Sequence, residues 1–284
     1  MNDPLMPSVA ALAARIPDGA KLAVPADYSG VAMAATRALV ARGARDLHLV
    51  CVPVSGLQAD ILIGAGCVST IETAGITLGE YGTGPRFAQA VKAGSLRLLD
   101  ATCPALHAGL QAAEKGIPFM VLRGILGSDI LARRPDWLVI GNPFAAEPAD
   151  DPIVALPAIH PDVALFHAPL ADRAGNVWIG RRRELMTMAH AATLTLVTVE
   201  QVVDKDLLAD DATAAGTIPA LYVSGVAEAP AGAWPLNLWD RYEADGVTLA
   251  AYVQAARSDA GFADFLARWL DGRLKGGAVA QAAE

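Results

Sequence analysis

Short runs of apolar, often β-branched residues alternate with Ala- and Leu-rich stretches through the first half of the chain. The pattern predicts strands at 21–25, 47–52 and 68–73, with helices at 31–42 and 57–63 between them. The connections are short and contain Gly and Pro. Because such an alternation is typical of βαβ units, we expect a parallel sheet with helices on both of its faces.

The same alternation continues as far as residue 140. Further strands are predicted at 96–99, 118–122 and 137–140, and further helices at 86–93 and 105–115. We expect these strands to continue the parallel units.

A second group of elements follows between Ile159 and Asp204. The sequence predicts a strand at 162–168, a polar turn at 171–176 and a short strand at 177–179. A helix at 184–192 and a β-branched strand at 194–199 complete the unit.

Part of this unit, PDVALFHAPLADRAGNVWIG, carries a resemblance to a known family. Further matching stretches are PVSGLQADILIGAGCV from Pro53, ATCPALHAGLQAAEKGIPFMVLRGILGSD from Ala101, and VEQVVD from Val199. Together they resemble the A subunit of two-subunit family I CoA-transferases, especially the glutaconate CoA-transferase type. In order and spacing, the resemblance covers roughly residues 15 to 230.

The resemblance implies the fold and its division. We expect a three-layer α/β domain with a parallel sheet over residues 1–230, and a C-terminal helical extension over residues 231–284. In the extension, amphipathic helices are predicted at 249–257 and 262–270. We expect them to pack on the domain or on a partner subunit.

The resemblance also implies a reaction. A glutamate carboxylate attacks an acyl-CoA thioester, and an acyl anhydride and then a glutamyl-CoA thioester form. That glutamate lies in an SENG-like motif of the B subunit, and this chain contains no such motif. We therefore expect a separate B chain that supplies the nucleophile, with coenzyme A as a substrate thioester and with small carboxylic acids as the other partners.

Composition narrows the class of protein. The chain has 284 residues, a formal net charge of −8 and a pI near 5.1, which argues against a nucleic-acid binder. No apolar run reaches the roughly 18 residues of a membrane span. The three Cys residues form no CxxC pair and the five His residues show no metal-ligand spacing. We expect a cytoplasmic protein with no metal and no membrane contact.

Ligands collect at the carboxyl ends of parallel strands, so we expect the pocket to be built from five loops. These are 26–30, 53–56, 79–85, 101–104 and 123–129.

In the first loop, Tyr28, Ser29 and Gly30 stand where the family has a GGF or GGW sequence, and only Gly30 remains. Ser29 or Tyr28 could donate to an oxyanion in place of the lost glycine. An alternative stays open, in which the loop is a surface turn and Ser29 caps the following helix.

Two further loops offer polar side chains for substrate. Ser55 could contact substrate, although capping of the next helix explains it more often. Arg123, with Gly124 and Ser128, could clamp a carboxylate through a bidentate fork. The alternative is a surface pair between Arg123 and Asp129.

Glu80 and Cys103 are the candidates for an assisting catalytic role. A glutamate is common in the Gly-rich loop of glutaconate-type A subunits, which gives Glu80 a possible place in the shared site. Cys103 precedes a predicted helix start, where thiols are often reactive, but a buried core position is the commoner role of a cysteine. The hydrolase branch of the family has a glutamate near this position and this chain does not.

Two remaining groups of polar residues favour structural roles. Asp172, Arg173, Gly175 and Asn176 suit a hairpin turn or a subunit interface. The basic run at 181–183 is typical of a solvated helix start or a subunit contact. Two rival functions stay open: a decarboxylase or carbon–carbon hydrolase acting on CoA thioesters, and a non-catalytic module that binds CoA esters.

Overall fold

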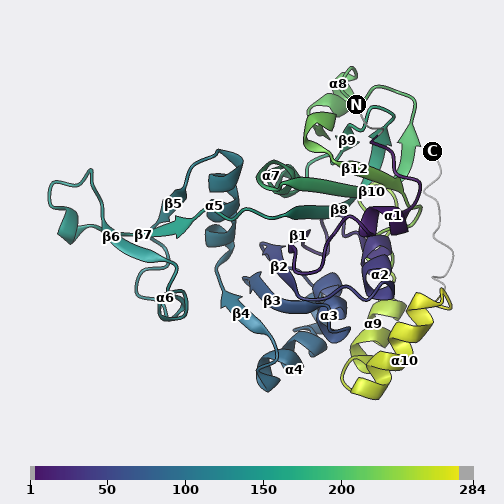
Figure 1. Cartoon of the computed structure of the whole chain (residues 1–284), viewed down its shortest axis with the longest axis horizontal. Helices are drawn as coiled ribbons and strands as arrows, with labels where there is room; N and C mark the ends of the chain where they lie inside the picture. Colours follow the sequence, from purple (N-terminus) through teal and green to yellow (C-terminus); the bar gives the residue numbers. More distant parts are fainter. Residues whose placement is uncertain (1–3, 275–284) are drawn as a thin grey trace.

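A computed structural model of the protein describes residues 4–274. Seven strands lie parallel in one sheet, in the order β4-β3-β2-β1-β8-β10-β12 (Figure 1). Their bounds are Lys21–Pro25 (β1), Leu47–Val52 (β2), Val68–Thr73 (β3), Arg97–Asp100 (β4), Val163–Asp172 (β8), Leu194–Val203 (β10) and Gly225–Glu228 (β12). The predicted parallel α/β core is therefore confirmed.

The sheet becomes mixed at one end. β8 pairs with β1 only through Val163 and Ala164, and its far half pairs antiparallel with β9 (Val177–Trp178). β9 pairs in turn with β11 (Thr217–Ile218). The predicted strand at 162–168 is thus longer than expected, because it continues through Asp172 before the hairpin turn.

Helices cover both faces of the sheet, which gives the expected three layers. On one face, α1 (Val9–Ala13), α2 (Met33–Ala41) and α3 (Leu57–Gly64) pack over the strands. On the other face lie α5 (Cys103–Glu114) and α7 (Arg183–Ala191).

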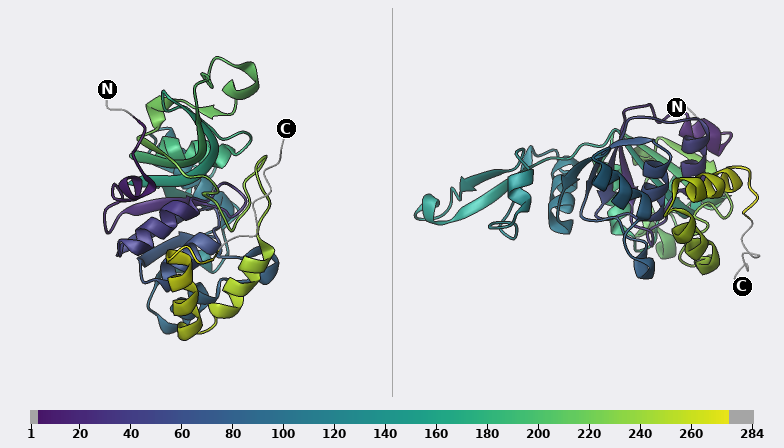
Figure 2. Two further views of the ribbon diagram at one scale, coloured as in Figure 1. Left: turned by 90° about the vertical axis from the view of Figure 1, so that its right-hand side faces the viewer. Right: turned by 90° about the horizontal axis from the view of Figure 1, so that it is seen from below.

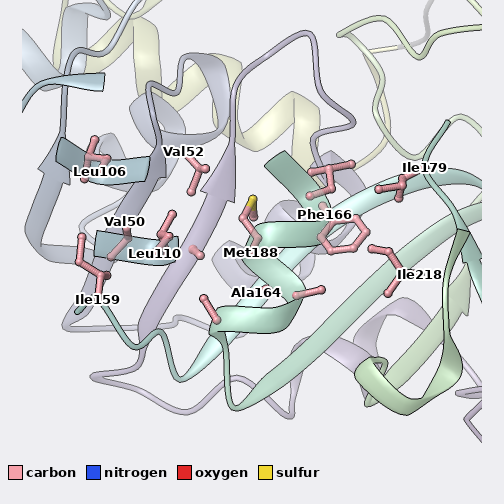
Figure 3. Packing of buried hydrophobic residues seen from close by; sticks show 14 of the residues in the cluster. Val50, Val52, Leu106, Leu110, Ile159, Ala164, Phe166, Ile179, Met188 and Ile218 are labelled. Carbon is pink, nitrogen blue, oxygen red and sulfur yellow. The ribbon is translucent and has the colours of Figure 1, made fainter. Parts of the chain in front are cut away.

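The alternation of β1 and β2 explains how both faces become buried. Leu22 and Leu49 point into the layer with α2, whereas Ala23 and Val50 point into the layer with α5. Figure 3 shows the second layer, in which Leu106 and Leu110 of α5 lie near Val50, and Met188 of α7 lies toward the Ala164–Phe166 part of β8.

The expectation that the strands near 118–122 and 137–140 continue the parallel sheet is wrong. β5 (Phe119–Leu122) and β6 (Leu138–Gly141) both pair antiparallel with β7 (Pro152–Pro157) in a separate sheet. This small sheet, with α6 (Ile130–Arg133), projects from the body (Figures 1 and 2). In β5 every second residue is exposed, as in a sheet with one covered face, so these strands lack the two-sided burial of β1 and β2.

The C-terminal helices pack on the domain. Phe262, Phe265 and Trp269 on α10 (Asp259–Leu270) are buried in a cluster that includes Leu57 of α3. On α9 (Gly246–Ala255), the Tyr252 hydroxyl donates to the carboxylate of Asp60 at 2.6 Å. The pairing of α9 and α10 is visible beside α3 in Figure 1.

Asp60 also organises the next helix. Its carboxylate accepts the backbone N–H of Phe87 at 2.7 Å, in the first turn of α4 (Pro85–Ala93). One buried carboxylate therefore joins three helices.

Among the described residues, no helix is long and apolar enough to cross a membrane.

Candidate functional site

The loop after β1 lies at the carboxyl edge of the parallel sheet and is fixed by β8. The carbonyl oxygen of Gly30 accepts the backbone N–H of His167 at 2.7 Å. Gly30 has φ +75, and a Cβ at this position would collide with the carbonyl oxygen of His167. Only glycine allows the loop to approach β8 so closely.

The two residues before Gly30 have different environments. Tyr28 is 54% exposed, whereas Ser29 is fully buried. The Ser29 hydroxyl donates to the Glu184 carboxylate, and its N–H donates to Ala26. The helix cap expected from Ser29 is wrong, because α2 begins at Met33 and Ala32 is its N-cap residue.

The backbone of the loop keeps donors available. Within residues 4–274, the N–H groups of Tyr28 and Gly30 have no acceptor. The Ser29 hydroxyl, by contrast, is already engaged with Glu184. His107 lies near Glu184; burial lowers the pKa of His107, and the Glu184 charge opposes this effect.

An arginine lies against the same loop. The Arg182 guanidinium carbon is 5.5 Å from the centre of the Tyr28 ring and 5.2 Å from that of Trp239. The sequence favoured a solvated helix start or a subunit contact for the basic run at 181–183. A guanidinium that lies over two rings differs from a freely solvated one, and no sequence signal links Trp239 to this position.

The segment that carries Trp239 is anchored by a buried polar network. His167 is fully buried, with Nδ1 2.8 Å from the Thr198 hydroxyl and Nε2 2.8 Å from the Glu200 carboxylate. Glu200 also accepts the Tyr242 hydroxyl at 2.7 Å and the N–H of Ala231 at 2.7 Å.

The network shifts the pKa of Glu200. Burial raises it, but hydrogen bonds from His167, Tyr242 and Ala231 outweigh burial, and the pKa of Glu200 is lowered overall. The ionised carboxylate therefore ties the C-terminal segment to β10 and holds Trp239 over the loop after β1.

In the loop after β2, the expected cap from Ser55 is wrong. Gly56 is the N-cap residue of α3, and no side chain of its own segment caps the helix. Instead, the Asp27 carboxylate accepts the N–H of Leu57, with Oδ2 3.0 Å from the nitrogen. Ser55 is 1% exposed and its hydroxyl has no partner among the described residues. A substrate contact by Ser55 stays a prediction.

Glu80 and Cys103 follow β3 and β4 and are both exposed. Glu80 lies in the 3-10 turn Gly79–Tyr81. Cys103 is the first residue of α5, and Thr102 is the N-cap residue. The core role favoured for Cys103 is therefore wrong. An assisting role for either residue in catalysis stays a prediction.

The fifth loop follows a strand of the small antiparallel sheet and not one of the parallel strands. Arg123, Gly124 and Ser128 lie after β5. Arg123 forms a two-pronged ion pair with Asp151, with Nη2 2.9 Å from Oδ2, so the pair predicted with Asp129 is wrong. The Ser128 hydroxyl donates to Ile125. A substrate clamp by these three residues stays a prediction.

The hairpin turn after β8 has the structural role that the sequence indicated. Asp172 accepts the N–H groups of Ala174 and Asn176, each at 3.0 Å. The Asn176 amide oxygen accepts the N–H of Ala220 at 2.7 Å. Arg173 pairs with Asp204.

In the described part of the chain, no group of three or more His, Cys, Asp or Glu residues is arranged to hold a metal ion.

Comparison with known proteins supports one family. The coenzyme A transferase family matches residues 6–229. The A subunit of 3-oxoadipate CoA-transferase from Pseudomonas knackmussii is 32% identical over 266 residues, 91% of this chain and 89% of that protein. The cholesterol ring-cleaving hydrolase IpdA subunit of Rhodococcus jostii is 30% identical, over 84% of this chain and 82% of that protein.

Solved structures agree with the sequence matches. Glutaconate coenzyme A-transferase from Acidaminococcus fermentans superposes with a TM-score of 0.85 at 25% identity, over 96% of this chain and 90% of that one. A point variant of the decarboxylase AibA/AibB superposes with a TM-score of 0.81 at 28% identity, over 95% of this chain and 99% of that one.

Proposed function

The chain belongs to the coenzyme A transferase family, and from this premise we propose that it is the A subunit of a heteromeric CoA-transferase. In this proposal the enzyme moves CoA between small dicarboxylic or oxo acids, in the cytoplasm. The observation that carries the proposal is the likeness, over 91% of this chain, to the A subunit of a 3-oxoadipate CoA-transferase. The A subunit of glutaconate CoA-transferase from Acidaminococcus fermentans, 29% identical over 76% of this chain, supports the same role.

The B subunit supplies the nucleophile in this proposal. Its glutamate carboxylate attacks the thioester carbonyl carbon, the C–S bond breaks, and CoA leaves as the thiolate. The thiolate then attacks the glutamyl carbonyl of the anhydride, which releases the first acid and leaves a glutamyl-CoA thioester. The second acid enters by the reverse of these two steps. This chain, which has no SENG-like motif, shapes one wall of the cavity.

The loop after β1 contributes hydrogen-bond donors. The amides of Tyr28 and Gly30 stabilise negative charge on the carbonyl oxygen as the tetrahedral species forms, because fixed donors need no rearrangement. Gly30 holds this backbone in place through its contact with His167. We also assign to the shared cavity Glu80, which is exposed in the loop after β3.

The test is to reconstitute the complex of this chain with its B subunit and to assay CoA transfer. Donors are acetyl-CoA and succinyl-CoA, and acceptors are glutaconate and 3-oxoadipate. We expect no turnover by the isolated chain and CoA transfer by the complex, with a CoA thioester found by mass spectrometry on a B-chain glutamate. Turnover by the isolated chain, or a covalent adduct on one of its side chains, would falsify the proposal.

A second candidate keeps the fold and changes the reaction. The likeness to one chain of a ring-cleaving hydrolase and to a decarboxylase favours a decarboxylase or carbon–carbon hydrolase that acts on a CoA thioester. The residue at the nucleophile position of the B chain separates the two. A B chain without that glutamate excludes the anhydride route and leaves the second candidate. A complex that binds CoA esters without converting them would indicate a binding module.

A further inference from the structure

Arg182 places a positive charge beside the loop after β1. It precedes α7 as the N-cap residue, and its guanidinium lies over the rings of Tyr28 and Trp239 at 5.5 and 5.2 Å. A contact between a guanidinium and the face of an aromatic ring is electrostatic and uses none of the N–H groups as conventional hydrogen-bond donors. The guanidinium therefore lies over two rings while its donors stay available.

The donors of Arg182 have no protein partner. Within residues 4–274, no carboxylate lies within ion-pair distance of it and no oxygen accepts from its side chain. The arginine after it differs, since Arg183 donates to the carbonyl oxygen of Ala215 at 2.9 Å. Arg123, the arginine that the sequence suggested as a clamp, is occupied by Asp151.

Arg182 lies beside the loop that contacts the reacting carbonyl of the substrate in the proposed function. Tyr28 belongs to the loop whose amides face a developing oxyanion in the proposed function. Trp239 borders the same loop, since its ring lies against Gly30 and Gly180. Its indole N–H is buried without an acceptor among the described residues. The neighbouring acid, Glu184, is engaged by the buried Ser29 hydroxyl.

We infer that Arg182, clamped by Tyr28 and Trp239, binds the non-reacting carboxylate of a dicarboxylic acid substrate. The inference rests on the proposed function and names its substrate class. A single guanidinium fork matches the two oxygens of a planar carboxylate. A phosphate of CoA offers the same kind of oxygen, and the experiment distinguishes these two sources.

The experiment measures binding to the complex of this chain with its B subunit by calorimetry. The probes are glutarate, pentanoate and adenosine 3′,5′-bisphosphate. We expect glutarate to bind the unaltered complex and to bind the Arg182→Gln complex roughly 10- to 100-fold more weakly. Arg182→Lys keeps the positive charge but loses the paired N–H donors of the guanidinium, so we expect an intermediate loss of glutarate affinity. Arg181→Gln removes an exposed neighbouring charge and should leave glutarate affinity within about twofold.

The probes also separate the outcomes. Pentanoate lacks the second carboxylate, so its affinity should be the same in the unaltered and Arg182→Gln complexes, which also shows that the variant is folded. A loss confined to adenosine 3′,5′-bisphosphate would overturn the inference in favour of a CoA phosphate site. Unchanged glutarate affinity in Arg182→Gln, or no glutarate binding by the unaltered complex, would also overturn it. Binding needs no turnover, so a complex that binds glutarate through Arg182 yet transfers no CoA refutes only the proposed function.

Discussion

The Asp27 carboxylate, in the loop after β1, accepts the backbone N–H of Leu57 at the start of α3, with Oδ2 3.0 Å from the nitrogen. A residue of one candidate loop therefore caps the helix that follows the next loop. The two loops are thereby held at a fixed separation. Burial of this carboxylate raises the pKa of Asp27 to about 7, against the opposing effect of the N–H groups of Leu57 and Gly56.

The raised pKa predicts a pH dependence of stability. Between pH 3.8, the ordinary Asp value, and about 7, the unfolded chain has lost the Asp27 proton and the folded chain keeps it. Unfolding then releases a proton, so this residue lowers the free energy of unfolding as pH rises through that window. Asp27→Asn keeps an acceptor for Leu57 and removes the titration. Relative to the unaltered protein, we expect it to gain up to about 4 kcal/mol between pH 4 and 8.

Urea unfolding at several pH values measures this difference. Only the difference between the two proteins is used, because other titrating groups contribute equally to both. If the free energies of unfolding of the two proteins change in parallel with pH, Asp27 is ionised in the folded protein.

Gly30 provides a test of the close approach of the β1 loop to β8. Gly30→Ala places a Cβ against the carbonyl oxygen of His167 at a residue with φ +75. We expect a loss of at least about 2 kcal/mol in the free energy of unfolding, together with loss of transferase activity in the complex. Gly43→Ala is the matched control, since it has φ +70 with nothing within 4 Å of an added Cβ. It should cost only about 1 kcal/mol and leave activity intact. Equal costs for the two substitutions would remove the steric argument.

Local patterns in the sequence were sufficient for the main sheet and insufficient for the site. β1, β2 and β3 occupy the predicted residues. In β1 and β2, burial on both faces leaves a nearly continuous apolar run, whereas β3 is more polar and only its last three residues are buried. β7 was missed, since Pro152–Pro157 lies next to a Pro- and Asp-rich loop and carries only a short apolar run. The pairing of β5 with β7 could not be predicted either, because local alternation does not tell which sheet a strand joins.

The site depends on contacts between distant residues. The loop carrying Tyr28, Ser29 and Gly30 was predicted from the strand that precedes it. Its partners Glu184 and Trp239 lie 155 and 209–211 residues further along the chain, and no local pattern connects them. The cap from Asp27 replaced the one expected from Ser55 for the same reason, since a cap is chosen by tertiary packing.

The network around Glu200 predicts how firmly the C-terminal segment is held. Tyr242→Phe removes a hydroxyl that donates to Glu200 at 2.7 Å and accepts the N–H of Ala233 at 3.1 Å. We expect a loss of about 1–3 kcal/mol in the free energy of unfolding, because two half-buried groups lose their partner. Hydrogen exchange of the Ala231 and Ala233 amides should also become faster.

Tyr81→Phe is the control for this substitution. The Tyr81 hydroxyl donates to Gly246 at 3.3 Å in an exposed position, so its removal should cost less than about 0.5 kcal/mol. If Tyr242→Phe is as mild as this control, the network does not anchor the segment.

Cys103 predicts a selective chemical modification of the isolated chain. It is exposed at the first residue of α5, whereas Cys51 and Cys67 are buried. Burial raises the pKa of Cys51 to about 12 and that of Cys67 to about 11, so both stay protonated as well as inaccessible at neutral pH. Iodoacetamide should therefore alkylate one thiol of three, at Cys103, as identified by peptide mass spectrometry. Rapid labelling of either buried thiol in the folded chain would contradict the packing of the layer beneath α2.

The same reagent tests whether Cys103 faces the shared cavity. Cys103 follows β4 at the carboxyl edge of the sheet, so a B subunit that closes a cavity over this edge should slow its alkylation at least tenfold. Alkylation of the isolated chain before assembly should then reduce CoA transfer, while the Cys103→Ser chain treated in the same way should be unaffected by the reagent. If labelling is equally fast in the complex and the alkylated chain assembles into a fully active enzyme, Cys103 lies outside the cavity. In that case its place at the start of α5 has no part in the reaction.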